Sequence, residues 1–339
     1  MRLSAISWHS KNLIKRAGLF QTTRLAVSVS RQLLQLQLLR KSIRQPIVVI
    51  SLLERLGDII ASEPIVSQVR ALHPTAFIIW CAGPNYKEIL KQHPDINGLL
   101  IVRSLTQWRA LASLFSFDRI YDLHPDRFPC HIFFPGFKKK YGDPSVKMEN
   151  YYSFPGGLLG CFSRAGGLPL KEKSPQLYIP DSIKRSVDKL ALPHRFAIAH
   201  TRSEETARDW RKDHWLRLHQ ELDIPLIEVG KYRTLNTRSE SPIMGKLSIL
   251  QTAEIIRRAC FFIGVDSGPA HLAHAVRTPG VILLGSFKNF RRYNPYVGFY
   301  EKPPGAIHVR VNGPASEIPY TMVREAVLLR MATLEDVNP

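Results

Sequence analysis

The chain has 339 residues, 45% of them hydrophobic and 22% charged, an ordinary globular composition that excludes a disordered or fibrous protein. This length accommodates two domains, each with its own core. The formal net charge is +19. The four cysteines lie far apart and form no Cys-x-x-Cys pair. We therefore expect Cys81, Cys130, Cys161 and Cys260 to be reduced thiols rather than a disulfide frame or a zinc site.

Residues 1–45 form a basic N-terminal extension, because no Asp or Glu occurs in residues 1–53. Nine basic residues lie in the first 44: Arg2, Lys11, Lys15, Arg16, Arg24, Arg31, Arg40, Lys41 and Arg44. Arg31 and Arg40 interrupt the apolar runs well before the ~20 residues of a membrane span. The pattern favours an amphipathic helix on an anionic membrane surface. The alternatives are a solvated arm and a helix that packs on the body. Nucleic acid is not an expected partner, since no basic-aromatic binding motif is found.

From Pro46 onward, short β-branched runs alternate with helical segments. Strands are expected at 47–50, 77–81, 98–102 and 119–122, and helices at about 56–72 and 86–92. This succession predicts a doubly wound parallel α/β domain over residues 46–180. Residues 123–180 look less regular and contain the basic run Lys138-Lys139-Lys140.

A second succession of the same kind is predicted over residues 181–315. Its expected strands are 196–200, 226–229, 261–265 and 281–284, and its expected helices are 212–222, 248–258 and one that follows Pro269. Residues 320–331 also look helical. Two similar domains joined by a linker predict a cleft between them, where ligands usually bind.

The strongest motif follows the expected strand 261–265. Asp266-Ser267-Gly268 leads into Pro269, which is well tolerated at the first position of a helix. Gly268 lets the backbone approach a ligand closely, and the free N–H groups of that helix would face a phosphate. His271 lies one turn further on. The alternative is a capped helix in which Asp266 and Ser267 merely satisfy backbone donors.

This segment resembles the C-terminal signature of the heptosyltransferase family, glycosyltransferase family 9, which has the GT-B fold. Asp266, Ser267, Gly268 and His271 match the family's Asp-Ser/Thr-Gly-x-x-His segment position by position. The resemblance implies that they bind the diphosphate and sugar of a nucleotide-sugar. It also implies that Leu247, in Gly-Lys-Leu-Ser, lines the nucleotide site.

A second match lies after the first expected strand, where Leu56-Gly57-Asp58 resembles the family's Leu-Gly-Asp. The resemblance implies that Asp58 is the catalytic base. Glycosyl transfer requires such a group, because an acceptor hydroxyl loses its proton as it attacks the anomeric carbon. The alternative is that Asp58 caps the helix that follows. Leu52 departs from the Arg or Lys that the family often has six residues before this Asp.

A third match reads Thr-Arg-x5-Arg-Asp-Trp-x4-Trp and begins at Thr201-Arg202. The resemblance implies donor binding by this loop, with Arg208 at the position of a basic residue that contacts the donor phosphates. A fixed guanidinium stabilises the charge that develops on a leaving diphosphate. The family usually has Lys here, so the charge is kept but its geometry changes.

Together these matches imply two Rossmann-like doubly wound parallel-sheet domains facing across a cleft, with the helix in residues 316–339 crossing back to the first domain. They imply inverting transfer of a sugar, heptose from ADP-heptose, onto a lipid-linked glycan of lipopolysaccharide core, by a cytoplasmic enzyme at the inner face of the cell membrane. No cofactor is expected, and no metal, since no Asp-x-Asp motif is present. The alternatives are transfer to a protein or another surface polysaccharide, or a non-catalytic sugar-nucleotide-binding protein.

Overall fold

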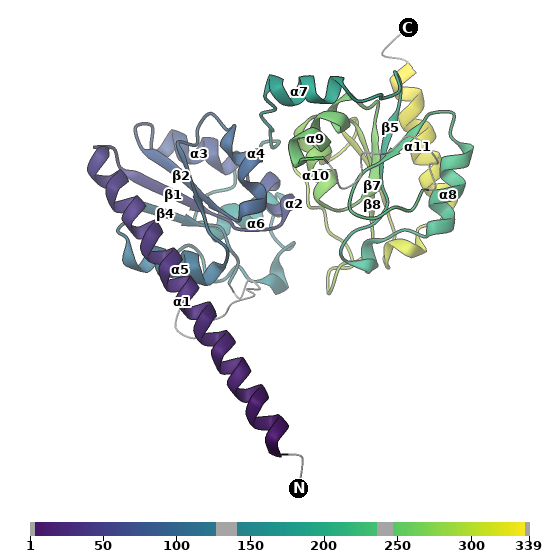
Figure 1. Ribbon diagram of the computed structural model, residues 1–339. Coiled ribbons are helices and arrows are strands. Elements are labelled where there is room, and N and C mark those ends of the chain that lie inside the picture. The colour runs from purple at the N-terminus through teal and green to yellow at the C-terminus, as the bar shows by residue number, and fades with distance from the viewer. Residues whose placement is uncertain (1–3, 127–140, 236–246, 336–339) are drawn as a thin grey trace.

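The computed structural model describes residues 4–126, 141–235 and 247–335, with side chains from residue 23 to residue 333. Two parallel sheets form two lobes (Figure 1). The first sheet has the order β3-β2-β1-β4 and consists of β1 Ile47–Ser51, β2 Phe77–Ala82, β3 Gly98–Ile101 and β4 Arg119–Asp122. The second has the order β6-β5-β7-β8-β9 and consists of β5 Ala197–His200, β6 Leu226–Glu228, β7 Phe262–Val265, β8 Gly280–Leu284 and β9 Ala306–Arg310.

Every pairing within the two sheets is parallel, in register such as Ile50 opposite Trp80 and Ile263 opposite Val281. The strand order of each sheet reverses beside its first strand, between β1 and β4 in one sheet and between β5 and β7 in the other. Ligands of open α/β sheets bind in the crevice outside the strand carboxyl ends at such a point. The loops after β1 and β7 are therefore the expected site, and they carry Asp58 and Asp266.

Helices cover both faces of each sheet. In the first lobe they are α1 Ser4–Ser42, α2 Leu56–Ala61, α3 Pro64–Leu72, α4 Lys87–Lys91, α5 Leu105–Leu114 and α6 Gly157–Ala165. In the second lobe they are α7 Asp181–Asp188, α8 Lys212–Glu221, α9 Ile249–Arg258, α10 Gly268–Ala275 and α11 Tyr320–Glu335. Single 3₁₀ turns lie at Pro84–Tyr86, Met148–Asn150, Thr206–Arg208, Gly298–Tyr300 and Ala315–Glu317.

The expected helix over 56–72 divides into α2 and α3. Pro64 is the first residue of α3 and follows the break at Ser62 and Glu63. The prediction of irregular structure between 123 and 180 is wrong for α6, whose first turn consists of glycine and leucine. The expected helix over 248–258 is confirmed as α9, with Ser248 as N-cap in a reciprocal capping box with Gln251.

The basic extension forms the long helix α1, which packs against α5 on the outer face of the first sheet. Val29 and Leu36 are buried there beside Trp108. Gln32 donates to the Ile101 carbonyl, and Arg40 forms a 2.7 Å ion pair with Asp118. Residues 23–42 therefore pack on the body and are not a solvated arm.

The last helix, α11, stays on the second lobe (Figure 1). It packs against β8 and β9, Tyr320 donates to Glu221 at 2.6 Å, and Arg330 donates to the Gly280 carbonyl at 3.3 Å. The expectation that this helix crosses back to the first domain is wrong for residues 320–335. Its apolar side chains, Val323 and Val327 among them, bury against the second sheet instead.

Candidate active site at the junction of the lobes

The loop that carries Asp58 is fixed by a buried histidine. The Leu53 amide donates to His124 Nε2 at 3.1 Å, so this nitrogen is the unprotonated acceptor. His124 Nδ1 therefore carries the proton and donates to the Asp122 carboxylate at 2.6 Å. The same carboxylate accepts the Ser51 hydroxyl at 3.0 Å. Two strand ends are thereby tied together just before the loop turns at Arg55, whose φ of 71° is left-handed.

Asp58 lies in the first turn of α2 and is 6% exposed. Its Oδ2 atom is buried and has no hydrogen-bond partner within the described part of the chain. Burial raises the pKa of Asp58 to about 6, against the opposing effect of the positive charge of Arg55. The Tyr151 hydroxyl lies near the carboxyl but outside hydrogen-bonding geometry. A carboxylate with a free oxygen and a pKa close to neutrality suits a general base.

Across the junction, the turn from β7 into α10 presents a helix N-terminus. Ser267 is the extended N-cap residue, but its hydroxyl donates back to the Val265 carbonyl at 3.1 Å and makes no capping bond to the helix. Ser267 and Gly268 are half-buried rather than sealed in the core. The positive end of the α10 dipole therefore faces the junction, as an anion site requires.

Asp266 is held by three side chains. Its carboxylate accepts the hydroxyls of Tyr293 at 2.9 Å and Tyr296 at 3.1 Å, and Arg208 lies 3.3 Å away. The group is 1% exposed. These contacts favour a role for Asp266 in holding the loop and Arg208 in place.

Arg208 joins the two lobes. Its guanidinium donates to the Asp266 carbonyl at 3.1 Å and to the hydroxyl of Tyr152, from the first lobe, at 3.2 Å. It lies 4.0 Å above the centre of the Phe287 ring. Burial acts to lower its pKa, but the charge of Asp266 and the Tyr152 hydroxyl outweigh that effect and the pKa is raised. Arg208 therefore keeps its full charge beside the α10 N-terminus, an arrangement that suits an anion such as a diphosphate.

His271 lies in the first full turn of α10 and is 3% exposed. Burial lowers its pKa to about 4, so the ring is neutral near pH 7. Its Nε2 atom is 3.8 Å from the Asp266 carboxylate, and its buried Nδ1 has no hydrogen-bond partner among the described residues.

The two lobes meet in a reciprocal contact of helices α2 and α10. A Cβ added at Gly57 would lie 2.7 Å from the ring of His271, and one added at Gly268 would lie 3.0 Å from Leu56. Each lobe thus inserts a side chain where the other has a glycine. This contact brings Asp58, Arg208, Asp266, Ser267, Gly268 and His271 to one junction.

The remaining predicted donor-binding residues have other contacts. The Thr201 hydroxyl is buried and donates to Glu228 at 2.5 Å, and Glu228 also accepts the Thr234 and Leu235 amides. Arg202 is exposed, over the ring of Tyr232 and 3.6 Å from Asp209. Leu247 is half-buried just before α9 and packs against the core. Their roles in donor binding stay predictions.

Sequence reasoning missed the aromatic shell of this junction. Tyr152, Phe287, Tyr293 and Tyr296 surround Arg208 and Asp266, and the rings of Tyr152 and Tyr293 lie 4.3 Å apart. They come from two distant segments without a motif. Only the density of tyrosine and phenylalanine between 287 and 300 hinted at them.

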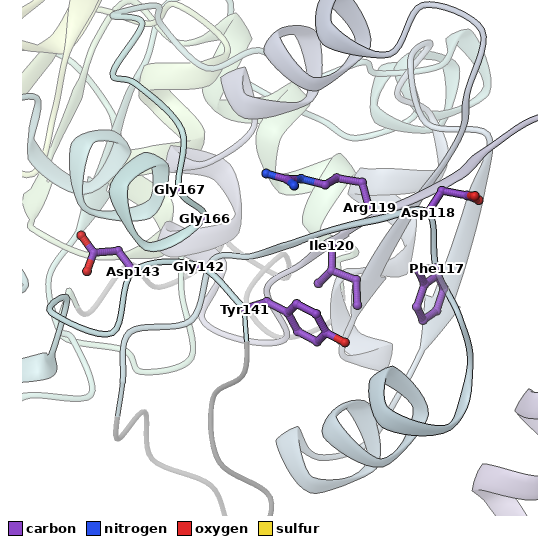
Figure 2. Close-up of a pocket in the computed structure, with 9 residues that line it drawn as sticks. All are labelled: Phe117, Asp118, Arg119, Ile120, Tyr141, Gly142, Asp143, Gly166 and Gly167. Carbon is purple, nitrogen blue, oxygen red and sulfur yellow. The ribbon is translucent and has the colours of Figure 1, made fainter.

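A separate pocket of about 490 Å³ lies at the start of β4 (Figure 2). It is lined by Phe117, Asp118, Arg119, Ile120, Tyr141, Gly142, Asp143, Gly166 and Gly167. Both of its acids already have partners, since Asp118 pairs with Arg40 and Asp143 with Arg164 at 3.0 Å. It belongs to the amino edge of the first sheet, opposite the edge that carries Asp58.

Two further observations concern the described residues alone. No three or more His, Cys, Asp or Glu side chains among them converge as metal ligands would. None of their helices combines the length and the apolar character needed to span a bilayer. The basic run Lys138-Lys139-Lys140 and Cys130 lie outside them.

The chain is similar to known proteins both in sequence and in fold. Residues 159–297 match the sequence model of glycosyltransferase family 9 (heptosyltransferase). No curated protein matches the chain. Similar solved structures include a glycosyl transferase family 9 protein from Veillonella parvula, with 16% identity, a TM-score of 0.65 and coverage of 85% of this chain and 97% of that one. E. coli ADP-heptose LPS heptosyltransferase II has 19% identity, a TM-score of 0.63 and coverage of 86% and 100%.

A third solved structure, E. coli heptosyltransferase WaaC with ADP, has 13% identity, a TM-score of 0.52 and coverage of 85% of this chain and 99% of that one. At these identities the likeness shows the fold, and it agrees with two Rossmann-like lobes. The matched segment 159–297 contains the Arg208 loop and the whole turn from β7 into α10. Residues 159–297 therefore resemble glycosyltransferase family 9 (heptosyltransferase), and the chain as a whole has the GT-B fold of two Rossmann-like lobes.

Proposed function

We propose that this protein is an inverting, metal-independent glycosyltransferase that moves heptose from ADP-heptose onto a lipid-linked glycan of lipopolysaccharide core. The observation that carries the proposal is the unpartnered carboxylate oxygen of Asp58, buried against the lobe that presents Arg208 and the α10 N-terminus. A base on one lobe and an anion cradle on the other are the two parts that a direct displacement needs.

In the proposed reaction, Asp58 accepts the proton of the acceptor hydroxyl while that oxygen attacks the anomeric carbon. The bond from that carbon to the diphosphate oxygen breaks, and ADP leaves with the electron pair. Attack opposite the leaving group in one step inverts the anomeric configuration. Arg208, Ser267 and Gly268 bind the diphosphate, His271 contacts the sugar as a neutral ring, and Asp266 holds Arg208 in place.

The donor and acceptor are proposed from the relatives. The E. coli heptosyltransferase II is named for ADP-heptose and LPS, and WaaC was solved with ADP. A lipid-linked acceptor would place the enzyme in the cytoplasm at the inner face of the membrane. Thr201, Arg202 and Leu247 are proposed to complete the donor site on the second lobe.

The test is a donor and acceptor screen with the full chain. ADP-heptose, UDP-glucose and GDP-mannose are each incubated with heptose-deficient lipopolysaccharide, with and without EDTA, and nucleoside diphosphate release is measured. Release from ADP-heptose alone, unchanged by EDTA and dependent on the glycolipid, is expected. Transfer to a protein or another polysaccharide would replace the acceptor assignment. Tight ADP binding without turnover on any acceptor would indicate a non-catalytic nucleotide-sugar-binding protein.

A further inference from the structure

Within residues 23–42, where side chains are described, helix α1 is anchored to the first lobe along one face. Val29 and Leu36 are 7% and 4% exposed, against α5 and the first sheet. The Gln107 side chain donates to Ser28 at 2.8 Å and to Gln32 at 2.6 Å, and Arg40 bonds to the Ser116 carbonyl at 3.0 Å. The described part of the helix is therefore held in one rotational orientation, and its opposite face points away from the protein.

That opposite face carries an apolar stripe. Val27, Leu34 and Leu38 are 65%, 57% and 57% exposed. Their spacings of seven and four residues place them on one side of an α-helix, turned about half a circle from Leu36. Three large apolar side chains in a row on an exposed helix mark a surface that takes a partner.

Basic residues border this stripe. The side chains of Arg24, Arg31 and Lys41 are exposed and lie on its two flanks at helical spacing. Residues 1–53 contain no acid that would neutralise them within this segment. The outer face of α1 therefore combines a narrow apolar ridge with positive charge on both sides.

The apolar ridge with its flanking positive charge discriminates between two possible partners of this face, a second copy of the chain and an anionic membrane. A second copy of the chain would bring another set of Arg and Lys side chains, from a segment without any Asp or Glu, against the first set, and like charges repel. An anionic lipid surface accepts the apolar ridge at the headgroup boundary and neutralises the flanking charges. We propose that the outer face of α1, centred on Val27, Leu34 and Leu38, docks the enzyme on an anionic membrane.

This inference goes beyond the proposed sugar transfer and does not depend on it, because α1 contributes no residue to the junction described above. The inner face of α1 is part of the core, so deletion of residues 1–44 would expose Trp108 and its neighbours. Point substitutions on the outer face test the docking without that damage.

The experiment measures sedimentation of the full chain with vesicles of phosphatidylcholine alone or with 30% phosphatidylglycerol. We expect binding to the anionic vesicles, and a reduction of about tenfold in the partition coefficient of Leu34→Gln/Leu38→Gln. The matched control, Leu72→Gln/Leu329→Gln, replaces leucines of similar exposure, 54% and 58%, elsewhere on the surface and should bind as the wild type does.

The charge arm uses Arg31→Glu/Lys41→Glu, which we expect to lower the partition coefficient at least ~20-fold. Its control, Lys189→Glu/Lys302→Glu, makes the same change in net charge on the second lobe. Equal losses in both pairs, or binding of the wild type to neutral vesicles as strong as to anionic ones, would overturn the proposal. So would a dimer in sedimentation velocity that Leu34→Gln/Leu38→Gln dissociates. Sugar transfer to a soluble acceptor fragment should be unaffected, so failure of one proposal leaves the other intact.

Discussion

Asp58 and Asp266 are both buried aspartates where the lobes meet, yet their surroundings are opposite. Asp266 accepts two tyrosine hydroxyls and pairs with Arg208. Asp58 has an oxygen without a partner among the described residues and a pKa raised to about 6. A satisfied buried carboxylate stabilises the fold, whereas an unsatisfied one costs stability and is available for chemistry. The difference supports the proposed roles, in which Asp266 organises the site and Asp58 acts as the base.

The largest expected effect is on turnover. Asp58→Asn should lower kcat by about 10³-fold, because the amide cannot accept the proton of the acceptor hydroxyl. ADP binding, measured by calorimetry, should be unchanged. The control Asp143→Asn removes an acid that pairs with Arg164 outside the junction and should keep full activity. Wild-type turnover in Asp58→Asn would remove the base from the mechanism.

Asp266→Asn should instead reduce stability. The substitution leaves Arg208 as a buried cation without its carboxylate, so the free energy of unfolding should fall by about 3 kcal/mol. Urea unfolding at pH 8 measures the loss. An unchanged midpoint would mean that the tyrosines and Arg208 do not depend on Asp266, contrary to the three contacts described above.

The stability of the protein should depend on pH through the ionisation of Asp58. The pKa of Asp58 rises on folding from 3.8 to about 6, so its contribution to stability is present below pH 4 and is lost as the pH rises through 6. Two pKa units correspond to roughly 3 kcal/mol. Asp58→Asn should therefore be more stable than the wild type at pH 8 by up to this amount and equal to it at pH 4.

The same ionisation should appear in the kinetics. The wild-type kcat/KM should fall tenfold per pH unit below about pH 6, because only the ionised carboxylate acts as a base. Melting temperatures of both proteins at pH 4 and pH 8, together with this rate profile, check the prediction. A stabilisation of Asp58→Asn that is the same at both pH values would show that relief of the buried charge is not its cause.

A smaller effect is expected for Arg208→Lys, which keeps the charge but loses the fork that contacts Asp266 and Tyr152 together. Transfer should slow by about tenfold, with weaker ADP binding. Arg217→Lys, at an exposed ion pair with Glu221, is the matched control and should have no effect. A loss for Arg208→Lys as large as that for Asp58→Asn would mean that the simultaneous contact with Asp266 and Tyr152 matters more than the charge.

The sequence predicts the strands well where they are β-branched runs buried on both faces, such as β1 and β8. It misses β9, which follows Pro303-Pro304-Gly305 and includes His308 and Arg310. Local pattern also says nothing of which surface the last helix covers, and α11 illustrates this. That choice depends on contacts such as Tyr320 with Glu221, from residues about a hundred positions apart.

The site divides in the same way. Asp58, Arg208, Asp266 and His271 stand in short motifs at strand ends, so the sequence identifies them and the fold brings them together. The sequence does not identify Tyr152, Tyr293 and Tyr296, because their contacts with Arg208 and Asp266 join residues that no motif connects. Thr201 stands in a motif, but its hydroxyl donates to Glu228, because a buried carboxylate needs every donor within reach.

The reciprocal packing of Leu56 on Gly268 and of His271 on Gly57 fixes the distance between the two lobes at this contact. A methyl group at Gly57 would clash with the ring of His271, and one at Gly268 would press against Leu56, so either would strain the contact that holds Asp58 near the N-terminus of α10. In the proposed reaction, the distance between Asp58 and the acceptor hydroxyl thus depends on glycine at both positions. The absence of side chains at Gly57 and Gly268 therefore sets how closely α2 approaches α10.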